Sequence, residues 1–244
     1  MLLSFISSYL SGTSIKLLLA NILLSIPVIL FALSAHEAAH GFIANKCGDP
    51  TAKLLGRVSL NPLKHLDPLG TICMLVVGYG WAKPVPIDPS RFKNPKKGMA
   101  LSAAAGPLCN LVLGFLNALL AGAFYPIAIY AGMRDVPMFV FYVLYALFQL
   151  FALGTIYNFV FAIFNLIPLP PFDGSRILYA VLPEKWYFGV MKYERYIMMT
   201  TLIVFLALFR FGWSPVSLLA DFLTDKSINL FVKLFNPLFY SLFF

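Results

Sequence analysis

The chain alternates between long apolar stretches and short segments that hold almost all of its charge. Residues 17–35 contain no charged side chain, and their length is close to the roughly 20 residues that a helix needs to cross a hydrocarbon layer. Two longer uncharged stretches, residues 98–133 and 136–172, are separated only by Arg134 and Asp135. The pattern predicts a first transmembrane helix followed by a helical hairpin that crosses the membrane twice.

Shorter apolar stretches complete the predicted architecture. Residues 68–82 are too short for a straight span and contain three glycines, so we expect a re-entrant or partly inserted segment. With the apolar residues 196–209 and 229–244, the chain predicts an all-α polytopic membrane protein, a bundle of about five to six transmembrane helices with a short re-entrant or β-hairpin element. We expect residues 1–244 to form a single membrane-embedded domain, with a core at about 15–180 and C-terminal helices at about 186–244.

Composition and charge exclude other classes of protein. Hydrophobic residues make up 60% of the chain and charged residues 11%, which is incompatible with a water-soluble globular domain. The net charge is +8, but nine of the 18 basic residues lie between Lys46 and Lys97, against three acidic residues there. Basic loops between apolar spans mark the cytoplasmic face. We therefore expect a multi-pass protein of the cell membrane in contact with lipid and no binding of nucleic acid.

The sequence HEAAH at residues 36–40 is the strongest chemical signal in the chain. Residues four apart on a helix project from one face, so His36 and His40 can bind the same metal ion, for which zinc is the expected identity. Glu37 then lies beside the pair, where its carboxylate can take a proton from water activated by zinc. The motif directly follows the first apolar span, and ionisable groups at membrane depth are costly enough to indicate function.

A catalytic zinc site needs a third protein ligand. Asp173 is the only charged residue between Val136 and Ser175, and it follows a proline-rich stretch in which a helix must end. We expect Asp173 to be this ligand, although an Asp-Gly turn at the membrane surface is the simpler explanation of the residue taken alone. His65 is the competing candidate. It lies in a polar loop bounded by prolines, where hydrogen bonding, proton handling or loop ordering are its alternative roles.

Two asparagines lie within otherwise apolar stretches, where each needs hydrogen-bond partners. Asn165 precedes Asp173 by eight residues, so its amide is a candidate for stabilising an oxyanion near the metal. Asn110 follows Gly106 and Pro107, and for it we favour a structural role between helices.

These motifs together resemble the site-2 protease family of intramembrane zinc metalloproteases, peptidase family M50. The segments that carry the resemblance are HEAAHGFIANKCGD (36–49), NPLKHLDPLGT (61–71), GPLCN (106–110) and NLIPLPPFDG (165–174). The resemblance implies that His36, His40 and Asp173 bind one zinc ion per chain. It also implies that Glu37 activates water and that Asn165 helps to position the scissile carbonyl.

The resemblance further implies a function and a cellular setting. The activity would be the hydrolysis of peptide bonds within transmembrane helices of other membrane proteins, as in regulated intramembrane proteolysis, with the active site near the cytoplasmic side. A β-hairpin that includes residues 82–87 would hold the substrate extended. No stretch is polar enough for a PDZ or CBS domain, so the chain resembles the short branch without such modules. A zinc-binding membrane transporter or a non-catalytic membrane adaptor is the alternative function.

Overall fold

The structure is a computed structural model that describes residues 14–77, 82–134, 136–210 and 215–243. The chain divides into two compact units, Met1–Gly106 and Pro107–Phe244, and the boundary falls within one helix. Helices predominate in both units, and the described residues contain no β-strand beyond an isolated antiparallel bridge between Leu66 and Ala82. The expectation of an all-α protein is therefore confirmed for the described part of the chain.

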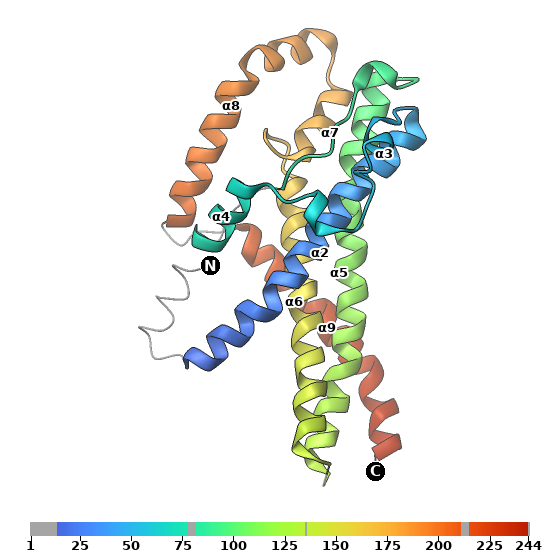
Figure 1. Ribbon diagram of the computed structural model, residues 1–244, viewed down its shortest axis with the longest axis vertical. Helices are drawn as coiled ribbons and strands as arrows, with labels where there is room; N and C mark the ends of the chain where they lie inside the picture. The colour runs from blue at the N-terminus through green and yellow to red at the C-terminus, as the bar shows by residue number, and fades with distance from the viewer. Residues whose placement is uncertain (1–13, 78–81, 135, 211–214, 244) are drawn as a thin grey trace. The chain divides into compact units, whose positions relative to one another are not determined.

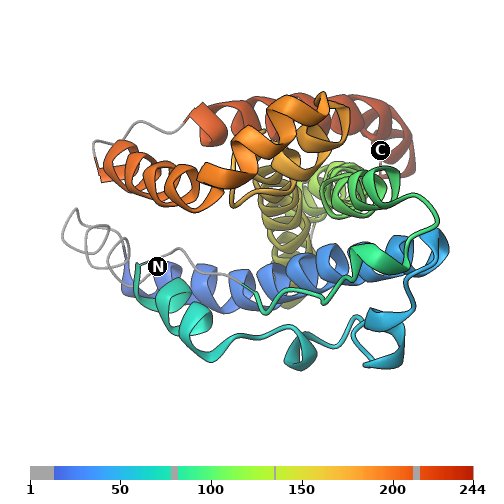
Figure 2. The same ribbon diagram turned by 90° about the horizontal axis from the view of Figure 1, so that it is seen from above.

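The first unit is built around one long helix. Helix α2 (Ile15–Cys47) contains the predicted first span and the HEAAH motif, and it ends at Gly48, where φ is 117° and the N–H donates to the carbonyls of Ala44 and Asn45. The chain then turns back along α2 (Figures 1 and 2). The remaining elements are α3 (Thr51–Leu54), η1 (Pro62–Lys64), α4 (Pro68–Val77), η2 (Pro89–Arg91) and the start of α5 (Pro95–Met133).

A segment without helical hydrogen bonds, residues 83–88, joins the isolated bridge to η2. Lys83, Val85 and Asp88 each precede a proline, and a residue before proline is held in the extended region. At the start of the segment, the Lys83 N–H donates to the carbonyl of His65 at 2.7 Å. The predicted hairpin falls partly on residues 78–81, which lie outside the described residues, so the hairpin stays a prediction.

The second unit contains the rest of α5 together with α6 (Met138–Asn165), α7 (Asp173–Val181), α8 (Glu184–Arg210) and α9 (Pro215–Phe243). The predicted hairpin of two long helices is present, because α5 and α6 run side by side in Figures 1 and 2. Phe159 packs so closely on Gly114 that a Cβ there would lie 2.6 Å from its ring. Helix α6 also packs against α9, and it ends before the prolines as predicted.

Three of the described helices are long and apolar enough to cross a membrane: Leu19–Cys47, Pro95–Met133 and Met138–Asn165, with mean hydropathy 1.9, 1.9 and 2.0. Their packing surfaces are made of small residues, because alanines at positions 32, 118, 121 and 162 are fully buried. Many large apolar side chains of these helices are instead exposed, and Leu23 and Phe139 are more than 70% exposed. This distribution is typical of helices that pack through small residues and turn large apolar ones toward lipid.

Candidate active site

His36 and His40 form a compact pair in the C-terminal half of α2. Both side chains are buried, with 5% and 7% of their surface exposed, and their Nε2 atoms lie 3.0 Å apart. The rings meet edge to face, with centroids 4.6 Å apart. The four-residue spacing therefore brings the two imidazoles together as the sequence predicts.

A backbone carbonyl fixes the orientation of His40. Its Nδ1 lies 2.7 Å from the carbonyl oxygen of Ser102 on α5, so Nδ1 carries the hydrogen and donates it. In return, the Ser102 hydroxyl donates to the carbonyl of His40 at 3.0 Å. A histidine that donates one ring N–H to a carbonyl presents the lone pair of its other nitrogen, the usual arrangement for a metal ligand.

Gly106 makes room for the histidine pair. A Cβ at this position would lie 2.5 Å from Nε2 of His40 and 2.6 Å from Cε1 of His36. These distances are too short for any side chain, so only glycine allows α5 to pass this close to the two rings. The glycine of the GPLCN motif is therefore part of the wall of the site.

The donor set and spacing suit zinc. Two nitrogen ligands about 2.0–2.1 Å from a tetrahedral zinc lie about 3.3 Å apart, close to the 3.0 Å between the two Nε2 atoms. Both nitrogens are buried and one ring is already oriented by Ser102. The first unit thus offers two candidate nitrogen ligands of the three protein ligands that a catalytic zinc site requires.

Glu37 contacts the 83–88 segment. Its Oε2 accepts a hydrogen bond from the backbone N–H of Val85 at 2.9 Å. The Val85 side chain is itself buried, and its Cγ1 would be 3.2 Å from a Cβ on Gly41, one helical turn after Glu37. The segment therefore packs over the same face of α2 that carries the glutamate.

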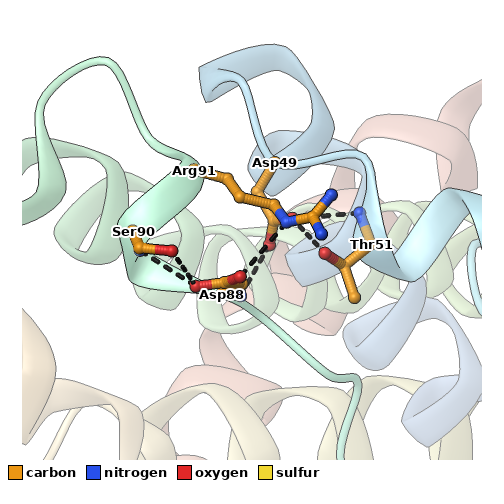
Figure 3. A network of polar contacts seen from close by, with 5 residues as sticks. All are labelled: Asp49, Thr51, Asp88, Ser90 and Arg91. Atoms are coloured by element: carbon orange, nitrogen blue, oxygen red, sulfur yellow. Dashed lines mark hydrogen bonds and ion pairs between the residues drawn. The ribbon is translucent and has the colours of Figure 1, made fainter.

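Asp49 ties the end of this segment to the end of α2 (Figure 3). The carboxylate is fully buried, accepts hydrogen bonds from the N–H and hydroxyl of Thr51, and accepts another from the Asp88 N–H at 2.7 Å. Burial acts to raise the pKa of Asp49, but these hydrogen bonds outweigh it and hold the pKa below its usual value. Asp49 is thus a charged anchor between two loops.

Asp88 continues the network toward solvent. Its carboxylate accepts hydrogen bonds from the N–H and hydroxyl of Ser90 and forms an ion pair with Arg91 at 3.1 Å (Figure 3). The Ser90 hydrogen bonds are the main reason that the pKa of Asp88 lies below its usual value. The ion pair is largely exposed and contributes little to stability.

The start of the segment is held by Arg57. Its Nη2 donates to the carbonyl of Lys83 at 2.7 Å and to that of Pro84 at 3.3 Å. Its Nε is buried and has no hydrogen-bond partner among the described residues.

The second unit contains the other two predicted site residues. Asp173 is the first residue of α7, directly after the proline-rich loop, and is half-buried. Gly174 lets this loop fold back, because a Cβ there would lie 2.3 Å from the carbonyl oxygen of Leu166. Asn165 is the last residue of α6, and its amide donates to the carbonyl of Phe161 at 3.0 Å.

The two remaining candidates are buried. His65 is 2% exposed and donates from Nε2 to the carbonyl of Ser59 at 2.7 Å, while its Nδ1 has no hydrogen-bond partner among the described residues. Asn110 is fully buried and donates to the amide oxygen of Asn158 at 2.8 Å, and Asn158 donates to the carbonyl of Gly154. This bond joins α5 to α6.

Sequence reasoning did not identify Ser102 or Arg57 as neighbours of the candidate residues, and it placed Val85 only within the predicted hairpin that includes residues 82–87. Val85 contacts Glu37 through its backbone N–H, and Ser102 contacts the His40 ring through its backbone carbonyl, so residue identity gives no signal for these two contacts. Only the hydrogen bond from the Ser102 hydroxyl to the His40 carbonyl depends on the residue type. Arg57 was one of nine basic residues that together indicated the cytoplasmic face. Only its contacts with Lys83 and Pro84 distinguish it from the others.

Comparison with known proteins agrees with this chemistry. The model of peptidase family M50 matches residues 126–209, which include the loop before Asp173. The "Putative zinc metalloprotease YwhC" of Bacillus subtilis is 38% identical over 213 residues, covering 86% of this chain and 91% of that protein. The zinc metalloprotease MJ0392 of Methanocaldococcus jannaschii is 28% identical over 171 residues, covering 70% of this chain and 36% of that protein. No solved structure gives a significant match.

The match to YwhC extends over most of both chains, so it covers the HEAAH region as well as the part that the family model recognises. The comparisons confirm a zinc-dependent peptidase activity and zinc as the cofactor, and the apolar helices confirm a membrane protein. The chain therefore belongs to peptidase family M50, the site-2 protease family, and is a zinc-dependent peptidase of membranes.

Proposed function

We propose that this peptidase cleaves peptide bonds within transmembrane segments of other membrane proteins, as in regulated intramembrane proteolysis. The observation that carries the proposal is the position of HEAAH: His36, Glu37 and His40 lie on α2, within the stretch Leu19–Cys47 that is apolar and long enough to cross a membrane. A hydrolytic motif on a membrane-spanning helix acts on bonds at membrane depth, where helical segments of other proteins lie.

The proposed zinc ligands are His36, His40 and Asp173, with one ion per chain. The histidine pair supplies two buried nitrogens whose spacing suits the metal. Asp173 supplies a carboxylate at the start of α7. We assign it as the third ligand because its motif resembles that of the family and because it directly follows a proline-rich loop that is not helical. Asn165, at the end of α6, is the proposed donor to the scissile carbonyl oxygen.

In the proposed mechanism, zinc when bound polarises the scissile carbonyl and lowers the pKa of water. Glu37 takes a proton from the attacking water while the water oxygen bonds to the carbonyl carbon. The same carboxyl group then gives this proton to the leaving nitrogen as the C–N bond breaks. Ser102 keeps His40 oriented throughout, because its carbonyl holds the ring N–H.

The setting of the proposed reaction follows from the charge pattern. The HEAAH motif lies near the end of α2 that carries Lys46 and leads into the basic loop, so we place the active site near the cytoplasmic side of the cell membrane. The proposed architecture is one protease domain of about five to six spans, with a β-hairpin that includes residues 82–87 and holds the substrate extended. Extension exposes amides that a helical substrate hides in its own hydrogen bonds.

The test is cleavage of a panel of transmembrane test segments by the wild type and by Glu37→Gln, compared at equal measured zinc content. We expect the wild type to cut within a transmembrane segment and Glu37→Gln to retain zinc but lose cleavage by at least about a hundredfold. Asn165→Ala should retain zinc and lose part of the rate.

Two results would contradict the proposal. If Glu37→Gln cleaves as fast as the wild type, Glu37 is not the base. If the wild type cleaves soluble unfolded peptides but no transmembrane segment of the panel, the substrates lie outside the membrane.

A further inference from the structure

Besides the hydrogen bond from the Lys83 N–H to the His65 carbonyl, side chains hold the 83–88 segment at three points, and the proposed mechanism involves only the side chain at the middle one, Glu37. At its start, Arg57 donates to the carbonyls of Lys83 and Pro84 at 2.7 and 3.3 Å. At its end, the Asp88 N–H donates to Asp49 at 2.7 Å. Between these anchors, the Val85 N–H donates to Glu37 at 2.9 Å.

The segment cannot be held by a ladder of backbone hydrogen bonds. Pro84 and Pro86 have no N–H, so two of its six residues cannot donate. Apart from the hydrogen bond of the Lys83 N–H to the His65 carbonyl, side chains from other parts of the first unit hold it, with a guanidinium at one end and a buried carboxylate at the other. The positions of the anchors therefore determine where the Val85 N–H lies.

Each anchor contains a buried polar group. Burial of the unpaired Nε of Arg57 costs free energy, because a buried donor without a partner loses its hydrogen bonds to water. Asp49 is a fully buried carboxylate, whose desolvation must be offset by its hydrogen bonds. What the two share is that each holds one end of the segment that contacts Glu37.

We infer that Arg57 and Asp49 are positioning residues of the protease, which fix the 83–88 segment so that the Val85 N–H holds one carboxylate oxygen of Glu37. The other oxygen is then left to face the attacking water. This inference rests on the proposed role of Glu37 as the base. A glutamate side chain has several rotatable bonds, and a base that is misplaced by about 1 Å loses about a hundredfold in rate.

The test uses the full-length enzyme and whichever substrate the wild type cleaves, a transmembrane segment or a soluble unfolded peptide. Arg57→Met removes the donors while keeping much of the side-chain length, and Arg57→Lys restores one donor. Asp49→Asn keeps the size but removes one acceptor. Val85→Pro removes the N–H that contacts Glu37, and its matched control Val85→Ala retains it. Arg91→Gln, which breaks only the exposed ion pair with Asp88, controls for general loosening of the network.

For each variant, kcat and KM are measured per zinc-loaded molecule, together with zinc content and unfolding temperature. We expect kcat of Arg57→Met, Asp49→Asn and Val85→Pro to fall by about ten- to a hundredfold, with KM within about twofold of wild type and zinc retained. Arg57→Lys should recover most of the kcat that Arg57→Met loses. The kcat of Val85→Ala should exceed that of Val85→Pro, and the kcat of Arg91→Gln should equal that of the wild type.

A purely structural role would lower the unfolding temperature and the yield but leave kcat per zinc-loaded molecule unchanged, and that result overturns the inference. A rise in KM at unchanged kcat overturns it too, because the segment would then act on substrate binding. Glu37→Gln is assayed in parallel: if it remains active, the proposed base is wrong. If it is inactive while Arg57→Met and Asp49→Asn are fully active, only the positioning roles are wrong.

Discussion

Gly106 lies against the histidine pair, so a substitution there tests whether the two rings need this space to bind zinc. We expect Gly106→Ala to reduce bound zinc by at least about tenfold, because its Cβ would lie 2.5 Å from Nε2 of His40 and would push both rings away from their ligand positions. Metal analysis of the purified variant after dialysis measures this. Gly189→Ala on α8 is the control, since nothing lies within 4 Å of a Cβ there. Full zinc content in Gly106→Ala would show that the rings can move without losing the metal.

The identity of the third ligand also belongs to the scale of single residues. We expect Asp173→Ala to lose zinc and His65→Ala to retain it, because His65 already donates its Nε2 hydrogen to the carbonyl of Ser59. Zinc stoichiometry, measured on variants with unchanged helix content by circular dichroism, distinguishes the two candidates. Loss of zinc from His65→Ala alone would transfer the ligand role to His65.

At the scale of elements, Gly48 ends α2 and directs the chain into the loop that contains Asp49. Gly48 adopts a φ of 117°, which side chains rarely tolerate, and a Cβ would also lie 3.1 Å from the carbonyl oxygen of Arg91. We expect Gly48→Ala to lower the free energy of unfolding by about 1–3 kcal/mol. Thermal unfolding in detergent, with Gly189→Ala as the helical control, measures the difference. An unchanged unfolding temperature would mean that the loop adapts without cost.

The elements themselves were largely predictable. Long uncharged stretches predicted α2, α5 and α6, and the prolines after Asn165 predicted the end of α6. Helices α8 and α9 lie within about the range expected for the C-terminal helices, 186–244, and both begin before the apolar stretches 196–209 and 229–244 because they include charged residues. A helix continues through polar residues as long as its backbone hydrogen bonds are satisfied, whereas hydropathy reports only the apolar part.

At the scale of the whole molecule, the charge pattern predicts the orientation in the membrane. We expect the basic loop to be cytoplasmic and the turn between α5 and α6 to be outside. Single cysteines at Lys93 and Arg134, in a chain whose Cys47, Cys73 and Cys109 are replaced by serine, can be labelled with a membrane-impermeant maleimide. Arg134→Cys should react in intact cells and Lys93→Cys only after the cells are opened. The opposite result would reverse the proposed orientation and place the active site on the outer side.

The sequence by itself determined the class of protein and the core of its chemistry. Apolar stretches indicate membrane helices, and HEAAH indicates a histidine pair that is suited to zinc, with an adjacent glutamate, because both patterns depend on residues close together in the chain. The pairing of His36 with His40 needed only the geometry of one helix.

Tertiary structure alone decided how these groups are held. The contacts of His40 with Ser102, of Glu37 with Val85 and of Arg57 with Lys83 span 62, 48 and 26 residues of chain. In each contact, one partner is a backbone group. Every residue type has a backbone carbonyl, and every type except proline has a backbone N–H. Such contacts leave no pattern in the residue types, because the fold and not the side-chain identity brings a particular carbonyl or N–H to the site.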